Sequence, residues 1–223
     1  TTTGSGLLKL DTSTGDIISI NGAQHNNQAG LAQAIDSSGA EQLIIGLLGS
    51  TTTSSGVQSF DLTSQQFTAG ALLAGLPSNA IQGFTFSLDS LFIATSSGIG
   101  QWNFTANAWE NPITTEDGLP DSFIGDVFWA SNTLYVASLS GMTQYIPTTG
   151  ASTTLKQSDG LLGNSVASFG SYTTANQGTW LIAVHDAALG ERPGLSVVDI
   201  SSNTVISTHR FDQLPSNTVT SVT

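Results

Sequence analysis

Short runs in which hydrophobic and polar residues alternate recur along the chain, separated by turns rich in Gly, Ser, Thr and Asn. Alternation combined with β-branched and aromatic residues predicts β-strands rather than helices. The strands return in a fixed order. One follows a Gly-Leu-Pro-like turn, the next is short and almost wholly apolar, the third begins at a glycine, and a weaker fourth strand closes the unit.

The clearest repeat is the turn phrase itself. "GLPSNAIQGFTF" occupies 75–86, and "GLPDSFIGDVFW" occupies 118–129, 43 residues later. Looser copies begin at 160 and 213, and a degenerate copy, "NNQAGLAQAID", begins at 26. Third strands are predicted to begin at Gly6, Gly56, Gly98, Gly141 and Gly194.

Four short antiparallel strands at a period of 40-odd residues are typical of a β-propeller blade. A β-sandwich array has a similar strand rhythm but does not require one turn phrase at this period. We therefore predict an all-β fold, a β-propeller of four-stranded antiparallel blades, with about four complete blades in residues 1–223 and partial blades at both ends. The register of the repeat predicts that the chain starts and stops in mid-blade. A segment of a longer polypeptide is favoured over a five-bladed ring closed by its termini, because one second strand is missing.

The first strands contain an irregularity in their pattern. Ile81 and Phe84, like Ile124 and Val127, are spaced by three, whereas a regular strand alternates by two. Either the first apolar residue belongs to the turn or a β-bulge shifts the phase. The sequence alone leaves both alternatives open.

Charge excludes several classes of partner. Only four residues are Lys or Arg against 16 Asp or Glu, giving a net charge of −12. No basic cluster exists to neutralise phosphates, which excludes nucleic acid and anionic membrane surfaces as partners. The absence of cysteine excludes disulfides, thiolate catalysis and cysteine-based zinc sites. The longest apolar run, 43–48, is far too short to span a bilayer. Abundant Ser and Thr with few Lys favour an extracellular location.

The repeat resembles a known family. The forms "GLP-S/D", a short strand such as "LYVAS", and "G-hydrophobic-x-x-Y/W" look like the two-component-regulator type of propeller repeat, most clearly from Gly75 to Tyr145. The resemblance covers nearly the whole chain and implies a propeller within a bacterial or archaeal extracellular protein. It implies no particular chemistry, since these motifs describe turns and packing.

One unit carries an unusual loop, which is the best candidate for recognition. Most turns between second and third strands are minimal, such as "TSSG" and "SLSG", but here "HDAALGERPG" occupies 185–194. Long loops on a rigid scaffold often bind partners. In propellers this turn shares a face with the loops that lead into first strands. We therefore predict a site for a protein or glycan partner. Its residues are His185, Asp186, Glu191, Arg192, Asp121 and Asp126.

The carboxylates of "TEDGLPD" offer two further interpretations. Glu116, Asp117 and Asp121 are predicted as a weak Ca²⁺ site, the only cofactor the chain suggests. Together with Asp126 they are also the candidates for a carbohydrate-active enzyme, because glycosidases and lyases use paired acids. Local turn chemistry is the favoured role.

No nucleophile or cofactor motif marks the chain as an enzyme. The three histidines, His25, His185 and His209, are expected in loops or on the surface, at no metal-ligand spacing. We predict a non-enzymatic, extracellular recognition or assembly module: a sensor ectodomain, an adhesin or a surface-structure component. It would be flanked by further blades or by other subunits. The alternatives are a carbohydrate-active enzyme and a purely structural subunit of a surface layer or filament.

Overall fold

The computed structural model describes most of the chain, and nearly all that it describes is β-structure. The described residues are 7–10, 13–14, 16–20, 28–35, 39, 41–47, 56–68, 75–78, 80–87, 89–103, 105–106, 108–174, 178–186 and 193–210. The chain divides into two compact units, residues 1–112 and 113–223.

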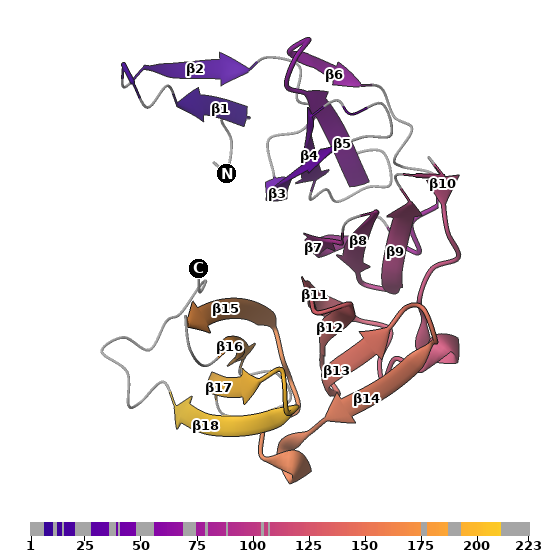
Figure 1. Cartoon of the computed structure of the whole chain (residues 1–223), viewed down its shortest axis with the longest axis vertical. Helices are drawn as coiled ribbons and strands as arrows, with labels where there is room; N and C mark the ends of the chain where they lie inside the picture. The colour runs from indigo at the N-terminus through magenta and orange to yellow at the C-terminus, as the bar shows by residue number, and fades with distance from the viewer. Residues whose placement is uncertain are drawn as a thin grey trace. The chain divides into compact units, whose positions relative to one another are not determined.

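The described strands of the first unit form one two-stranded and two four-stranded antiparallel sheets (Figure 1). The two-stranded sheet pairs β1 (Leu7–Leu10) with β2 (Ile17–Ile20). The four-stranded sheets are β3 (Gln28–Ile35), β4 (Glu41–Leu47), β5 (Gly56–Asp61) and β6 (Gln66–Thr68), then β7 (Ile81–Phe86), β8 (Ser90–Thr95), β9 (Gly98–Asn103) and β10 (Ala108–Trp109).

The described strands of the second unit form two four-stranded antiparallel sheets. They are β11 (Ile124–Ala130), β12 (Thr133–Ser138), β13 (Gly141–Ile146) and β14 (Ala151–Leu155), then β15 (Ser168–Thr174), β16 (Gly178–His185), β17 (Gly194–Asp199) and β18 (Thr204–Arg210). A single 3₁₀ turn precedes the Gly-Leu turn of each sheet: η1 (Thr115–Asp117) and η2 (Gln157–Asp159).

Every four-stranded sheet is a meander in which each strand pairs with the next one along the chain. This strand number, order and direction confirm the predicted all-β fold of four complete propeller-type blades, and β1 with β2 confirm the partial blade at the N-terminal side. The "LAQAID" stretch is strand, as the repeat requires, in β3. The first strand predicted after residue 213 lies outside the described residues.

The hydrophobic core of the second unit lies between its two sheets. Tyr135, Ala137 and Met142 of the first sheet pack against the second sheet, and all three are almost fully buried. The opposing residues are Leu181, Ala183 and Val198. Leu161 and Val166, from the segment that joins the sheets, enter the same core. Burying the apolar faces of both sheets supplies the main drive for this packing.

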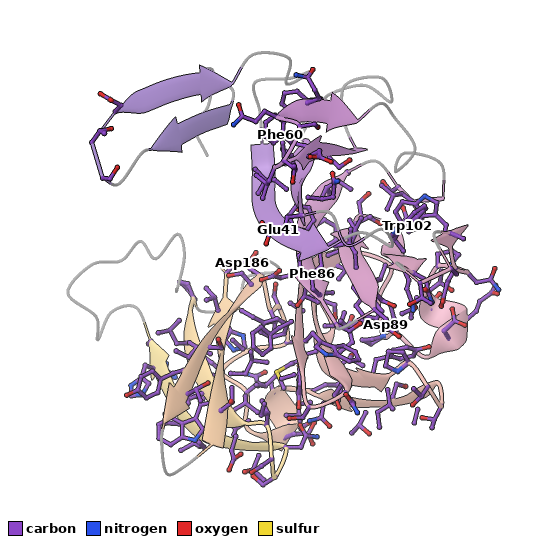
Figure 2. All side chains as sticks on the ribbon, turned by 45° about the horizontal axis from the view of Figure 1, so that its top comes forward. Glu41, Phe60, Phe86, Asp89, Trp102 and Asp186 are labelled. Atoms are coloured by element: carbon purple, nitrogen blue, oxygen red, sulfur yellow. The ribbon has the colours of Figure 1, made fainter. Side chains whose placement is uncertain are left out.

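Each four-stranded sheet of the first unit has its own described cluster. Ile81, Leu91 and Ile93 are fully buried, and Trp102 contacts Trp109 edge to face beside them, with ring centroids 5.4 Å apart. In the other sheet Ile45 and Phe60 are the buried members of the cluster. Figure 2 shows Phe60 and Trp102 on their respective sheets. The aromatic rings therefore stabilise the outer strands, which are short.

The irregular spacing in the first strands is due to β-bulges. The pairing of β7 with β8 shifts between Ile81 and Gly83, and that of β11 with β12 shifts between Ile124 and Asp126. The extra residue lets Ile124 and Val127 both reach the buried side of their strand, although they are three apart. Of the two alternatives that the sequence left open, the bulge is correct.

No helix in the described part of the chain is long and apolar enough to cross a membrane.

The start of β13 requires glycine, which gives a test of the fold. Gly141 has φ +132°, and a Cβ there would strike the carbonyl oxygen of Leu155. We expect Gly141→Ala to lower the free energy of unfolding by roughly 3 kcal/mol, the upper end for a strained backbone position. Urea denaturation measures this. Gly150→Ala is the matched control, because Gly150 also has positive φ (+69°) but open space around it; it should cost about 1 kcal/mol. Equal losses in the two variants would contradict the predicted clash.

Candidate functional site

The turn before the first strand touches the turn between the second and third strands in three of the sheets. A side-chain hydrogen bond joins the two turns each time. The pairs are Ser78 Oγ with Ser96 Oγ at 2.8 Å, Ser140 Oγ donating to Asp121 Oδ2 at 3.1 Å, and Ser165 Oγ donating to Asp186 Oδ1 at 2.6 Å. The expectation that these two kinds of loop share one end of a blade is therefore confirmed.

In the second unit the two sheets bring these turns together. The main-chain N–H of Val166, just before β15, donates to the carbonyl of Ser138, the last residue of β12 (2.9 Å). We call the resulting surface the loop face: residues 118–123, 139–140, 160–165 and Asp186. Of the sequence-predicted site residues, Asp121 and Asp186 lie on it, and Asp186, labelled in Figure 2, belongs to the exposed residues. Glu191 and Arg192 lie outside the described residues.

Asp121 is held in place by its own turn. Its Oδ1 accepts from the main-chain N–H of Phe123 at 3.1 Å, and its Oδ2 accepts from Ser140. The first bond is the local turn chemistry expected of Asp. The carboxylate is only partly buried, so it adds negative charge to the loop face in a fixed orientation.

The expected surface or loop position is wrong for His185. It is the last residue of β16 and is fully buried. Its Nδ1 lies 3.0 Å from the carbonyl oxygen of Ser165, so Nδ1 must carry the proton and donate. Its Nε2 lies 2.7 Å from Ser196 Oγ, and Ser196 Oγ accepts from the main-chain N–H of Leu162 at 3.0 Å. The ring can be buried because the Ser165 carbonyl and the Ser196 hydroxyl give both of its nitrogens a partner within the fold.

Comparison of the repeats shows what His185 replaces. At the same position, Thr95 ends β8 and Ser138 ends β12, and both are fully buried. Each hydroxyl donates to the carbonyl of the glycine that opens the third strand, Gly98 or Gly141. A hydroxyl closes a minimal turn in this way. In the unit with the longer connection the larger imidazole reaches Ser196 instead.

Asp126 joins the first strands of the two sheets. Its Oδ2 accepts from the main-chain N–H of Phe169, in β15, at 2.9 Å, and its Oδ1 accepts from the main-chain N–H of Val127 at 2.9 Å. The preceding Gly125 lets the strands approach, since a Cβ there would lie 2.6 Å from the carbonyl oxygen of Ala167. Burial raises the pKa of Asp126 to about 6, against these two hydrogen bonds. Its position serves the packing of the sheets, and it is not grouped with Asp121 by any hydrogen bond of the described residues.

The other two acidic residues of "TEDGLPD", Glu116 and Asp117, lie in the η1 turn. Asp117 Oδ2 accepts from the main-chain N–H of Thr114 at 2.9 Å and closes a capping box around η1. Glu116 is exposed in the same turn. Among the described residues no three acidic or histidine side chains are grouped so that they could hold a metal ion. Ca²⁺ binding by Glu116, Asp117 and Asp121 stays a prediction.

Sequence reasoning missed the serines that support the site. Ser165 and Ser196 are fully buried, and Ser140 is partly buried. A signal was present in part: Ser78 and Asp121 each stand three residues after a turn glycine, whereas Ser165 stands five residues after Gly160. That these polar residues bond to a residue of the turn between the second and third strands becomes clear only from the strand register in the structure.

No protein-family model matches the sequence, and no curated protein matches it. Solved structures are similar. The extracellular domain of a hybrid two-component system from B. thetaiotaomicron has a TM-score of 0.66 and 16% identity, over 94% of this chain and 28% of that chain. The corresponding domain of a second such system from the same organism has a TM-score of 0.67 and 17% identity, over 92% of this chain and 25% of that one.

An enzyme is among the similar structures. Hydrazine synthase of Kuenenia stuttgartiensis has a TM-score of 0.57 and 11% identity, over 80% of this chain and 48% of that chain. At these identities the likeness shows the fold alone, because one fold hosts many functions. The chain spans about a quarter of the two-component-system chains that it matches. The resemblance to two-component-regulator repeats stays a prediction, since no family model matches.

The pKa of Asp126 predicts the pH dependence of stability. Because the pKa is about 6 in the folded state against 3.8 normally, the folded state binds more protons between these values. Stability therefore falls as pH rises from about 4 to 7, by about 3 kcal/mol from this group. Urea denaturation at several pH values measures it in the wild type and in Asp126→Asn, which cannot ionise. The wild type should lose more stability over this range than the variant; parallel curves would contradict the assignment.

The buried serine beside His185 gives a second prediction. Ser196→Ala removes the acceptor of the Leu162 N–H inside the fold, which typically costs about 1–3 kcal/mol. Ser140→Ala, whose hydroxyl bonds the partly exposed Asp121, is the matched control and should cost less than about 1 kcal/mol. Thermal unfolding at pH 7 compares the two. If Ser140→Ala were the more damaging, the hydrogen bond from the Leu162 N–H to Ser196 would not be an important support of the segment that connects the two sheets.

Proposed function

We propose that this chain is part of a non-enzymatic extracellular recognition module, of the kind found in sensor ectodomains. The similar solved structures from two-component systems support an extracellular sensor. The absence of enzymatic activity in this proposal rests on the hydrogen bonds that the candidate acidic side chains make. Asp117, Asp121 and Asp126 each accept a main-chain hydrogen bond that shapes a turn or joins two strands.

The loop face is the surface on which we propose that recognition occurs. It combines two oriented carboxylates, Asp121 and Asp186, with the hydroxyls that hold them, on turns anchored to a buried core. Oriented acceptors on a rigid scaffold suit hydrogen-bond donors such as the hydroxyls of a glycan or the main-chain N–H groups of a protein loop. Because binding would order little of this scaffold, its entropic cost stays low.

The carbohydrate-active enzyme remains the second candidate. One feature favours it: Asp126 has its pKa raised to about 6 by burial, as an acid catalyst would need. It requires a second acid facing Asp126 at a catalytic separation. The structural subunit of a surface layer or filament has no comparable support. Adhesion and assembly are roles that the same loop face would also serve.

Binding and turnover measured on the same protein test the proposal. We expect the chain to bind at least one member of an array of neutral and acidic glycans, without releasing reducing sugar from it. Asp186→Ala should weaken that binding about tenfold, the loss typical of a charge-assisted hydrogen bond. Asp16→Asn, an exposed acid of the first unit, is the matched control and should leave binding unchanged.

Either of two results would overturn the proposal. If Asp186→Ala and Asp16→Asn changed the affinity equally, the loop face would not be the binding surface. Reducing sugar released by the wild type and not by Asp126→Asn would establish the enzyme instead.

A further inference from the structure

Three parts of the second unit meet at the buried ring of His185. Its Nδ1–H donates to the carbonyl oxygen of Ser165, in the turn before β15, and its Nε2 lies against the hydroxyl of Ser196 in β17. Ser196 Oγ also accepts from the main-chain N–H of Leu162, at the start of the same turn. We call these four groups the His185 cluster: the imidazole, the Ser165 carbonyl, the Ser196 hydroxyl and the Leu162 N–H.

The hydrogen bonds of the cluster are complete only when the ring is neutral. Nδ1 carries the ring proton, so Nε2 accepts from the Ser196 hydroxyl. A second proton would make Nε2 a donor. Nε2–H and the Leu162 N–H would then both point at Ser196 Oγ, and the hydroxyl hydrogen would have no acceptor among the described residues. A polar group left in this way inside the fold is costly.

The surroundings of the ring do not offset the charge of a protonated imidazole. A buried cation is tolerated when an acid is bonded to it, whereas the two ring nitrogens here face a carbonyl and a hydroxyl. The charged or titratable side chains on the described elements around the ring are exposed to water or, for Asp121, partly buried, and water screens them. They are Asp186, Lys156, Asp159, His209, Arg210 and Asp121.

The repeat does not require a titratable residue at this position. Thr95 and Ser138 end the corresponding strands β8 and β12, and both are fully buried like His185. Their hydroxyls stay neutral at every physiological pH. Of the three sheets that can be compared here, the one containing β15–β18 therefore has the group that can respond to pH in this range.

We propose that His185 makes the loop face sensitive to pH: in acidic surroundings the ring takes up a proton, and the turn before β15 is released from β16 and β17. The proton is best accommodated when the cluster opens and the ring reaches water. Lowering the pH therefore favours the open arrangement. An imidazole in water takes up a proton at about pH 6.5, which sets the range in which opening should begin.

Opening would act on recognition through Asp186. Ser165 Oγ donates to Asp186 Oδ1 at 2.6 Å, and the carbonyl of the same Ser165 is held by His185. Releasing Ser165 therefore removes the bond that fixes the carboxylate. This consequence rests on the proposed role of the loop face, whereas opening of the cluster does not. An extracellular module built in this way would bind at neutral pH and release its ligand in acid.

Hydrogen exchange of main-chain amides, followed by NMR on the whole chain between pH 7.5 and 5, measures the opening. After correction for the intrinsic exchange rate, we expect the protection of the Leu162 N–H to fall by up to about tenfold per pH unit below pH 6.5, the limit for uptake of one proton. The matched control is the Ser96 N–H. It donates to the carbonyl of Ala80 and follows Thr95, which stands where His185 does, so its protection should not change.

Variants assign the effect to one ring. His185→Gln should abolish the pH dependence of Leu162 protection, because glutamine cannot ionise. His209→Gln is the control, since His209 is exposed on β18 and should leave the dependence unchanged. Asp126 acts in the opposite direction, because its raised pKa stabilises the fold as the pH falls. Loss of Leu162 protection in acid therefore cannot come from Asp126.

Four results would overturn the proposal. Leu162 protection that is the same at pH 7.5 and 5 would show that the cluster does not open. Equal losses at Leu162 and Ser96 would show general acid unfolding. A dependence that persists in His185→Gln would assign it to another group. If that variant does not fold, the ¹⁵N signals of the ring in the wild type decide, and a ring that stays neutral while protection falls contradicts the proposal.

The outcome is separable from that of the proposed function, because none of these measurements needs a ligand. Glycan binding at pH 7 in the wild type and in Asp186→Ala tests the loop face alone. If Asp186→Ala leaves binding unchanged, the pH-dependent opening at His185 is unaffected. If Leu162 protection does not respond to pH, recognition by the loop face is equally unaffected.

Discussion

The joint between consecutive sheets is the constraint on which the second unit depends. One stretch of chain, 160–169, makes most of it. Leu161 and Val166 enter the core between the sheets, and the N–H groups of Val166 and Phe169 bond to Ser138 and Asp126 of the preceding sheet. Hydrophobic burial and directional bonds thus come from the same ten residues. A four-stranded sheet has two faces to cover, and this stretch fixes how the next sheet covers one of them.

The residues that suggested chemistry are largely used by this joint. Asp126 joins β11 to β15 by accepting from the Phe169 N–H. His185 and Ser196 hold the turn before β15 by hydrogen bonds to the Ser165 carbonyl and the Leu162 N–H. A buried His bonded to a Ser resembles the pair of a hydrolase, but here Ser196 Oγ already accepts a main-chain N–H inside the fold. Polar groups with no access to solvent most often specify packing, because leaving any one of them without a partner is costly. Recognition then falls to groups outside the joint, such as Asp186.

Much of the fold could be predicted from the sequence, because the strands and turns of each repeat are specified by residues that are close together in the chain. Strand order, the role of Gly141 and the partial blade of β1 and β2 all follow from alternation and turn residues. The bulge at Gly125 could not be chosen over its alternative, since both give the same spacing of Ile124 and Val127. Choosing between them requires the register with β12, which is a contact between strands and not a property of one strand.

The candidate site was less predictable, for a different physical reason. Asp121 and Asp186 were found because they lie in turns, but the burial of His185 depends on Ser165 and Ser196, which are distant in sequence. Single residues carry little information about such three-dimensional neighbours.

Internal repeats help to separate structural from functional residues, because the same position can be compared in several sheets of one chain. When three sheets share one register, a position filled by Thr95, Ser138 and His185 shows both what the fold needs and where one unit departs from it. The histidine at position 185 differs from the hydroxyl residues of the other sheets, but it makes hydrogen bonds to Ser165 and Ser196 inside the fold. Its role is therefore structural.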